Sequence, residues 1–214
     1  MTNEQIIHHK TSSRSKVFTA RNMAVTGVLG ALATVLMVFE FPLPFLPPFY
    51  KLDFSEVPIL LGGFALGPVP AAAMEAIKVV LHMVVAGGSQ TMGVGDLANF
   101  IFGCAFVVPA AILYRSRKSR KRALIGMGAG TAAMTVVGAV LNAFVLLPVY
   151  AVAFHLPLGQ IVAMGTALNA NIVDLPTFVI FATTPLNLIK GVLVSAITFL
   201  LYKHVSPILH GRRM

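Results

Sequence analysis

The feature that most constrains this chain is a series of long apolar stretches, each with about the length of a membrane-spanning helix. A helix needs about 20 mainly apolar residues to cross the hydrocarbon core of a bilayer. With 57% hydrophobic and 11% charged residues, the 214-residue chain carries more apolar surface than one soluble core can bury. We therefore expect an all-α integral membrane protein. Four stretches qualify as spans: residues 17–39, 96–114, 123–150 and 178–203.

A fifth apolar region, residues 57–86, is interrupted by Pro68 and Pro70 and could form one kinked helix or two helices. Thirteen of the 16 Lys and Arg residues lie in three segments between or beside the long apolar stretches. The positive-inside rule places all three segments in the cytoplasm, so an even number of crossings must precede the middle one. We therefore expect a turn at 67–70, a short helix over 56–66, six transmembrane helices, and cytoplasmic N- and C-termini. The basic residues are Lys10, Arg14, Lys16 and Arg21; Arg115, Arg117, Lys118, Arg120, Lys121 and Arg122; and Lys203, Arg212 and Arg213.

The expected organisation is one membrane domain, residues 17–205, between a cytoplasmic tail at 1–16 and a basic cytoplasmic tail at 206–214. The connections at 40–55, 87–95 and 151–177 then face outward. The first is rich in proline and aromatic residues, which excludes regular helix. It is either a lid or lining over a site that opens outward, or an interfacial loop whose rings lie among the lipid headgroups.

Ionisable side chains within the spans require a partner or a function, because each costs about 2.5–3.5 kcal/mol at a helix centre on insertion scales. Glu75, Lys78 and His82 share one helix face, and an ion pair between Glu75 and Lys78 is the simplest explanation for them. Lys190 has no acidic residue within a helical turn. Either a carboxylate from another helix or a bound ligand must therefore supply its acceptors.

Two amides accompany Lys190 in otherwise apolar helices. Asn187 lies one turn before it, and Asn142 lies in the preceding apolar stretch. Amides and an ammonium group suit an uncharged ligand rich in hydrogen-bonding groups better than a metal or a bare anion. The alternative is that these side chains only join helices through hydrogen bonds.

Small residues four positions apart allow helices to approach closely. Gly27 and Ala31 form such a pair in the first apolar stretch, and Gly126 and Gly130 form another. Packing within the bundle is the simpler interpretation of both pairs, and docking onto a membrane partner is the alternative.

Several function classes are disfavoured by the sequence. Gly93–Asp96 matches the G-x-G-D string of intramembrane aspartyl proteases, but Asp53 and Asp174 lie in outer connections and cannot pair with it inside the membrane, so a helix N-cap role is expected for Asp96. No H-E-x-x-H, G-x-S-x-G or phosphate-loop motif occurs, so we expect no catalytic residues, no enzyme activity and no nucleotide site on this chain. We expect no metal site, and Cys104 as the single cysteine excludes an intrachain disulfide. The placement of the basic residues also argues against nucleic acid as a partner.

Six segments, in order, resemble the riboflavin-specific S components, the RibU family, of energy-coupling factor (ECF) vitamin transporters. The resemblance extends from about residue 20 to 207, and the six segments are specific only when taken together. They are Pro47–Pro58 (PPFYKLDFSEVP), Gly63–Pro68 (GFALGP), Glu75–Lys78 (EAIK), Thr91–Phe100 (TMGVGDLANF), Leu141–Tyr150 (LNAFVLLPVY) and Pro185–Gly191 (PLNLIKG).

The resemblance implies a multi-pass protein of the bacterial cell (cytoplasmic) membrane that captures riboflavin from outside. It also implies a separate energising module, made of a transmembrane coupling protein and two cytoplasmic ATPase subunits. Riboflavin would be the transported ligand and not a cofactor. Gly27 and Ala31 stand where many S components have the A-x-x-x-A face that docks on the coupling protein, and Val79 stands where the family usually has Asn.

For the ligand site, the resemblance points to the polar residues already singled out. Asn142, Asn187 and Lys190 would bind the hydrogen-bonding edge of the flavin, and Leu52, Asp53 and Gly95 would be further contacts. An S component for another vitamin remains an alternative, because pocket residues decide the ligand on a shared scaffold. An ATP-independent small-molecule carrier is a further alternative.

Overall fold

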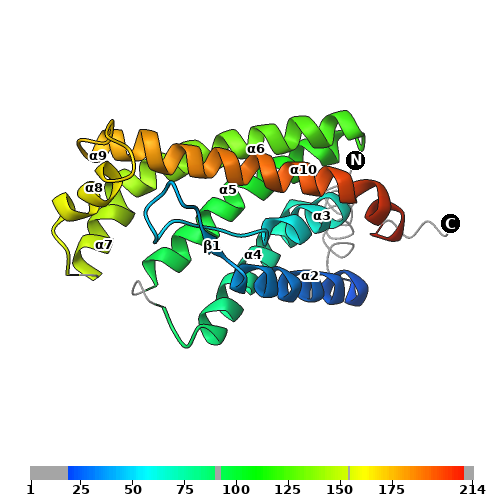
Figure 1. Cartoon of the computed structure of the whole chain (residues 1–214). Coiled ribbons are helices and arrows are strands. Elements are labelled where there is room, and N and C mark those ends of the chain that lie inside the picture. The colour runs from blue at the N-terminus through cyan, green and yellow to red at the C-terminus, as the bar shows by residue number, and fades with distance from the viewer. Residues whose placement is uncertain (1–18, 90–92, 154, 210–214) are drawn as a thin grey trace, which may run out of the picture.

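The fold is all-helical apart from one two-residue strand pair, as expected (Figure 1). The computed structural model describes residues 19–89, 93–153 and 155–209. The predicted tail at 1–16 lies outside these residues, and helix α10 continues past residue 205. The elements are α2 (Ala20–Val38), β1 (Phe41–Pro42), β2 (Lys51–Leu52), α3 (Glu56–Leu66), α4 (Pro68–Val85), α5 (Val94–Ser116), α6 (Arg120–Leu141), η1 (Asn142–Leu146), α7 (Leu147–Ala153), α8 (Leu158–Thr166), α9 (Leu175–Phe178), η2 (Val179–Thr183) and α10 (Thr184–Leu209).

The predicted turn between the second and third helices is confirmed. Helix α3 ends at Gly67, whose φ of +104° lies in the left-handed region that favours glycine. Pro68 then occupies the first turn of α4, where its fixed φ suits the helix and its missing N–H costs no hydrogen bond. The sequence Gly-Pro therefore ends one helix and starts the next.

Among the residues that the structure describes, five helical segments are long and apolar enough to cross a membrane. Two of them are composite, because α6, η1 and α7 join into Arg120–Ala153, and α9, η2 and part of α10 join into Leu175–Tyr202. The sixth expected span, α3, has 11 residues, which is short for a crossing. The connection at 151–177 contains a nine-residue helix, α8, which was not predicted from the sequence.

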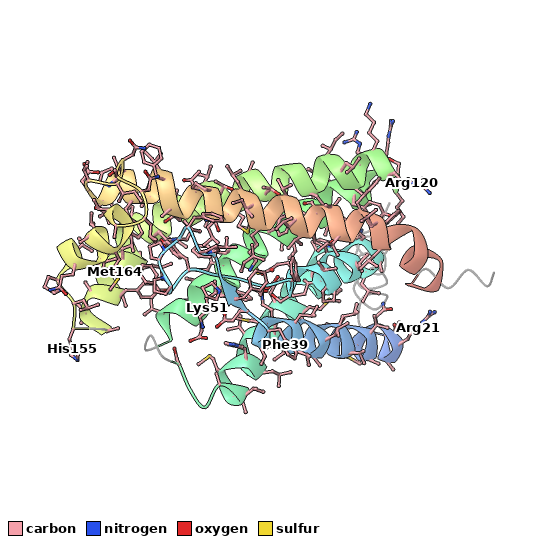
Figure 2. The ribbon with its side chains drawn as sticks, viewed as in Figure 1. Arg21, Phe39, Lys51, Arg120, His155 and Met164 are labelled. Atoms are coloured by element: carbon pink, nitrogen blue, oxygen red, sulfur yellow. The ribbon has the colours of Figure 1, made fainter. Side chains whose placement is uncertain are left out.

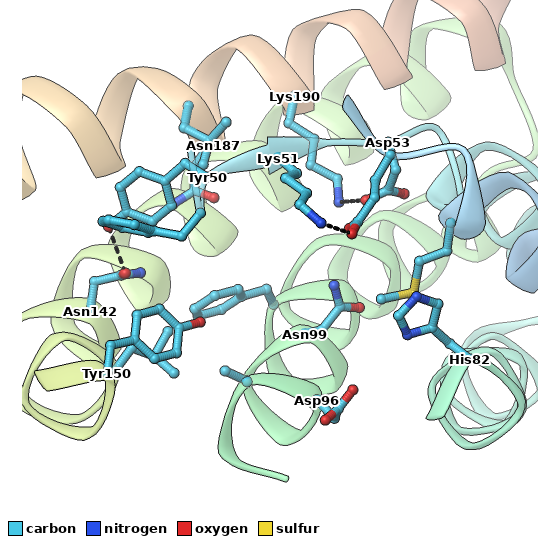
Figure 3. A pocket seen from close by; sticks show the side chains of 18 of the residues that line it. Tyr50, Lys51, Asp53, His82, Asp96, Asn99, Asn142, Tyr150, Asn187 and Lys190 are labelled. Atoms are coloured by element: carbon cyan, nitrogen blue, oxygen red, sulfur yellow. Dashed lines mark hydrogen bonds and ion pairs between the residues drawn. The ribbon is translucent and has the colours of Figure 1, made fainter. Parts of the chain in front are cut away.

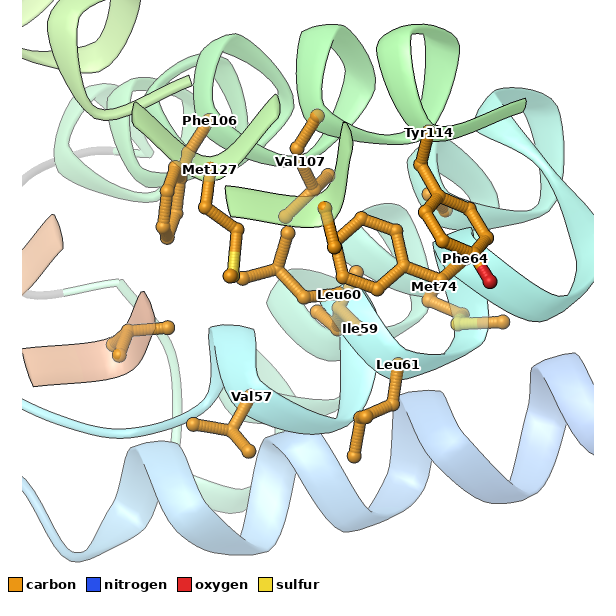
Figure 4. Packing of buried hydrophobic residues seen from close by; sticks show 14 of the residues in the cluster. Val57, Ile59, Leu60, Leu61, Phe64, Met74, Phe106, Val107, Tyr114 and Met127 are labelled. Carbon is orange, nitrogen blue, oxygen red and sulfur yellow. The ribbon is translucent and has the colours of Figure 1, made fainter. Parts of the chain in front are cut away.

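Helix α3 lies at the centre of the bundle. It packs against α2, α4, α5 and α10, and every residue from Glu56 to Phe64 is buried. Around it, α2 lies beside α4, α4 beside α5, α5 beside α6, and α6 beside α10 (Figure 1). Figure 4 shows α3 side chains such as Leu60 and Phe64 among Phe106, Tyr114 and Met127 of the surrounding helices.

The two ends of the bundle differ in their charge. Figure 2 shows Arg21, near the start of α2, and Arg120, at the start of α6, at the same end. The α5–α6 connection, which carries Arg117 and Lys118, lies at this end as well. His155 and Met164, from the region of α7 and α8, lie at the opposite end (Figure 2).

The glycine pair on α6 packs inside the bundle, which confirms the simpler interpretation for that pair. A Cβ atom at Gly126 would lie 2.8 Å from the backbone oxygen of Ala110, and one at Gly130 would overlap the backbone oxygen of Phe106. By contrast, Gly27 on α2 has no heavy atom of another residue within 4 Å of the same position. Gly126 and Gly130 therefore allow α5 and α6 to approach closely, whereas Gly27 faces outward.

We predict that Gly130→Ala destabilises the protein by about 1–3 kcal/mol, because the added methyl group must push α5 away from α6. Gly128→Ala is the matched control on the same helix, since a Cβ there meets nothing within 4 Å and alanine favours helix. Thermal unfolding in detergent, followed by circular dichroism, compares the two variants. Equal transition temperatures would contradict the close α5–α6 packing.

Candidate functional site

A cavity of about 320 Å³ lies between the helices and the connection at 40–55, which we call the proline-rich segment (Figure 3). Its volume is near the lower end of the range for small-molecule sites. Helices α2, α4, α5, α7 and α10 and both π-helical segments, η1 and η2, contribute to its wall. The proline-rich segment contributes Phe49, Tyr50, Lys51 and Asp53.

The proline-rich segment is folded onto the bundle. Its ends pair as antiparallel strands, with Phe41 opposite Leu52 and Pro42 opposite Lys51. Leu46 and Tyr50 are buried in a hydrophobic cluster with Phe178 and other residues of the far end of the bundle. The segment therefore lines the site, as the first of the two interpretations expected.

Five of the six predicted binding residues meet at this cavity: Asn142, Asn187, Lys190, Asp53 and Gly95. Leu52 is fully buried and does not line it. The reason is the alternation of side chains along a strand. Lys51 of β2 faces the cavity, so its neighbour Leu52 faces the protein interior.

The acceptors of Lys190 are carboxylates from distant parts of the chain. Its Nζ atom lies 2.9 Å from Oδ2 of Asp53 and 3.1 Å from Oε2 of Glu56. The first of the two alternatives for Lys190 is therefore correct. Of these two contacts only the one to Asp53 is a hydrogen bond, and an ammonium group has three N–H donors, so donor capacity remains for a ligand in the cavity.

Glu56 links Lys190 to the ionisable groups on α4. Its Oε1 atom accepts a hydrogen bond from Nζ of Lys78 at 3.1 Å, and Nζ of Lys78 lies 2.7 Å from Oε2 of Glu75. The predicted Glu75–Lys78 pair is confirmed. Glu56 was missed, since nothing in the local sequence pairs the start of α3 with two lysines 22 and 134 positions further on.

Asp53 anchors the proline-rich segment through its charge. Burial opposes ionisation of its carboxyl group, but the ammonium groups of Lys190 and Lys78 outweigh burial and lower the pKa of Asp53 to about 2. The backbone N–H of Ser55 also donates to Oδ1 of Asp53 at 2.8 Å. The carboxylate is therefore ionised at neutral pH, and the contact to Lys190 is an ion pair.

Tyr50 is a second anchor of the proline-rich segment. This role was not predicted from the sequence. The hydroxyl group of Tyr50 lies 2.8 Å from Oδ1 of Asn142 (Figure 3). It also lies 2.6 Å from Oγ1 of Thr183. Asn142 is the first residue of η1, and Thr183 is the last residue of η2. π-Helical turns occur frequently at functional sites. A single loop residue thus joins two irregular helical segments across the cavity wall.

One end of the cavity is aromatic. The rings of Phe49, Tyr50 and Tyr150 line it, and the Phe49 ring is stacked on Phe178 with 6.4 Å between centroids. Asn187 reaches the same region, where Gly138 leaves room for its amide. Within the residues that the structure describes, the Asn187 amide has no hydrogen-bond partner. It is therefore available to a ligand.

The N-cap role predicted for Asp96 is wrong. The cap position of α5 is Gly93, in a left-handed conformation, and Asp96 lies in the first turn of the helix. Its carboxylate accepts a hydrogen bond from the hydroxyl group of Ser89 and lines the cavity. The position is still favourable for an acidic residue, because the N-terminal end of a helix carries partial positive charge.

Residues 21–202 match the family model described as "ECF transporter, substrate-specific component". The chain therefore belongs to the family of substrate-specific components of ECF transporters. Proteins of this kind are transporter subunits and not enzymes.

Two riboflavin transporters are similar to this chain over most of its length. The chain is 34% identical to the riboflavin transporter FmnP of Bacillus subtilis (strain 168), over 90% of this chain and 96% of that protein. It is 35% identical to the riboflavin transporter RibU of Staphylococcus aureus (strain TCH60), over 88% and 92%. A solved structure described as the S component of a bacterial ECF transporter superposes with a TM-score of 0.69 at 33% identity, covering 90% of this chain and 98% of that one.

We predict that Asp53→Asn lowers the free energy of unfolding at pH 7 by about 2 kcal/mol, from the fall in the pKa of Asp53 from 3.8 to about 2. A carboxyl group whose pKa is lower in the folded than in the unfolded state stabilises the folded protein at pH values above its unfolded-state pKa. The difference between variant and wild type should therefore shrink below about pH 4 and vanish as the pH falls through about 2.

Chemical unfolding followed by circular dichroism over this pH range tests the prediction. The control is Glu40→Gln, which breaks the more exposed 2.5 Å ion pair between Glu40 and Lys51 and should cost at most about 1 kcal/mol. A penalty for Asp53→Asn that stays constant down to pH 2 would show that charge is not its source.

Proposed function

We propose that this chain is the riboflavin-binding subunit of a bacterial ECF transporter. The observation that carries the proposal is the cavity in which aromatic rings meet Asn142, Asn187 and Lys190. Riboflavin presents a flat, largely apolar ring system, one edge with carbonyl and imide groups, and a hydroxyl-rich chain. The aromatic rings suit the flat face, while the amides and the ammonium group suit the polar edge.

Three residues have distinct roles in this proposal. The Asn187 amide has no partner among the described residues and can both donate to and accept from the ligand. Lys190 donates its remaining N–H to a ligand oxygen while Asp53 and Glu56 hold the ammonium group in place. Asn142 also lines the cavity, next to the aromatic ring of Tyr50. Asp53 and Gly95 also line the cavity.

The proposed topology has six crossings with both termini in the cytoplasm. Five helices have the length of a span, and α3 makes the remaining short crossing inside the bundle. This arrangement places the end with Arg21 and Arg120 in the cytoplasm, as the positive-inside rule requires, and opens the site toward the outer face. The membrane is then the bacterial cytoplasmic membrane, and the membrane domain extends over about residues 17–205.

The proposed partners are a transmembrane coupling protein and two cytoplasmic ATPases. Support for a docking face comes from α2, where Gly27 has an open surface and Ala31, Val28 and Leu32 are exposed. A small-residue face of this kind allows a second helix to approach closely in the membrane.

We predict that Asn187→Ala weakens riboflavin binding about 10-fold or more. A polar group of the ligand that is buried without its hydrogen-bond partner costs about 1–3 kcal/mol of binding free energy. Quenching of riboflavin fluorescence by the purified protein in detergent measures the affinity. Asn171→Ala is the control, since Asn171 is exposed between α8 and α9. No quenching by the wild-type protein at micromolar concentration would reject riboflavin as the ligand, and equal affinities of the two variants would misplace the site.

We predict that the double variant Gly27→Leu/Ala31→Leu binds riboflavin normally and fails to support uptake, because bulky side chains block the approach of a partner helix. Uptake of labelled riboflavin by cells that carry the energising module measures transport. Gly128→Leu is the control, because Gly128 also has an open surface but lies on α6. Normal uptake by the double variant would exclude this face as the docking site.

A further inference from the structure

A chain of hydrogen bonds runs from Thr183 through Tyr50 and Asn142 to the backbone oxygen of Gly138. Each group in it can donate in only one direction. Nδ2 of Asn142 lies 2.8 Å from the backbone oxygen of Gly138, which can only accept, so the amide nitrogen must face it. Oδ1 of Asn142 therefore faces the Tyr50 hydroxyl group, which donates to it at 2.8 Å. The phenol has one proton, so the Thr183 hydroxyl group donates to the Tyr50 oxygen at 2.6 Å. Each orientation follows from the one before it.

The chain is sheltered from water and keeps its protons. Thr183 is fully buried, and Asn142 and Tyr50 are 2% and 7% exposed. Burial raises the pKa of Tyr50 above its usual value, so the phenol remains a donor at any physiological pH. Its ring is fixed by contacts with Phe49 and Phe178, at 4.9 and 6.0 Å between centroids.

The direction of the chain decides what Asn142 offers to the cavity. One of its two N–H groups is bound to Gly138, and its oxygen is bound to Tyr50. Turning the amide over would place its oxygen against the Gly138 oxygen, which is unfavourable. The group left for a ligand as a donor is the second N–H, whereas Asn187 keeps both functions.

We propose that Tyr50 is a positioning residue that saturates the oxygen of Asn142 and so makes Asn142 a hydrogen-bond donor to a carbonyl oxygen of the ligand. This inference rests on the proposed function and deepens it. The site selects a planar heterocycle that turns a carbonyl oxygen toward η1, and the imide N–H of the same ligand is left for Asn187. Tyr50 acts through Asn142 and need not touch the ligand.

A double-mutant cycle with riboflavin as the probe tests the inference. Tyr50→Phe keeps the ring and removes one hydroxyl group, and it should weaken binding about 2–13-fold, the net effect of one hydrogen bond. In the Asn142→Ala background the same substitution should change affinity less than 2-fold, because its route to the ligand is gone. In the control background, Asn187→Ala, it should keep its full effect.

Infrared difference spectra of bound riboflavin, labelled with ¹³C at its two ring carbonyl carbons, provide a second measurement at saturating ligand. One carbonyl band should move to higher frequency in Asn142→Ala, and the same band should move in the same direction, by less, in Tyr50→Phe. Equal losses of affinity in both backgrounds, or an unchanged band in Tyr50→Phe, would overturn the role of Tyr50 while leaving riboflavin as the ligand. A wild-type protein that does not bind riboflavin would instead reject the proposed function.

Discussion

The buried ion-pair network from Asp53 through Lys190, Glu56 and Lys78 to Glu75 is the interaction on which the rest of this structure depends. Burying charge is costly unless the charges are paired, and removing one partner leaves the other uncompensated. Here the pairing joins four separate parts of the chain: the proline-rich segment, α3, α4 and α10. Glu56 is central, since each of its oxygens faces a different lysine. A helix of 11 residues that is too short to span the bilayer comfortably is thereby fixed inside a bundle of longer ones.

The proline-rich segment belongs to the core as much as to the surface. It is held at one point by the charge of Asp53 and at another by the hydroxyl group of Tyr50, and its apolar residues pack with Phe178. The two attachments differ physically. The ion pair is strong over a range of distances and orients little, whereas the hydrogen-bond chain is short in range and fixes the direction of each group. The cavity wall thus combines a strong ion pair at Asp53 with an amide of fixed orientation at Asn142.

Much of the helical arrangement could be predicted because its signals are local. Apolar length gave the spans, Gly67 and Pro68 gave the helix break, and polar residues in apolar helices pointed to Asn142, Asn187 and Lys190. What the sequence did not reveal depends on contacts between distant positions. The pairing of Lys190 with Glu56 requires the packing of α3 against α10, and no local pattern marks η1, η2 or α8. Asp96 was misassigned because the N-cap of α5 is the left-handed glycine Gly93, three residues before the expected cap.

The two π-helical segments have a consequence for the shape of the site. Each accommodates its residues in wider turns than the α-helix that surrounds it, so the helix beyond it is rotated relative to a regular continuation. One residue corresponds to about 100° of rotation in an α-helix. Tightening η1 to α-helical turns would rotate Tyr150, which lies beyond it, relative to Asn142, and tightening η2 would rotate Thr183 relative to Phe178. Because the loop residue Tyr50 bonds to Asn142 and Thr183 and contacts Phe178, rewinding either helix would disturb the loop attachment and the pocket together.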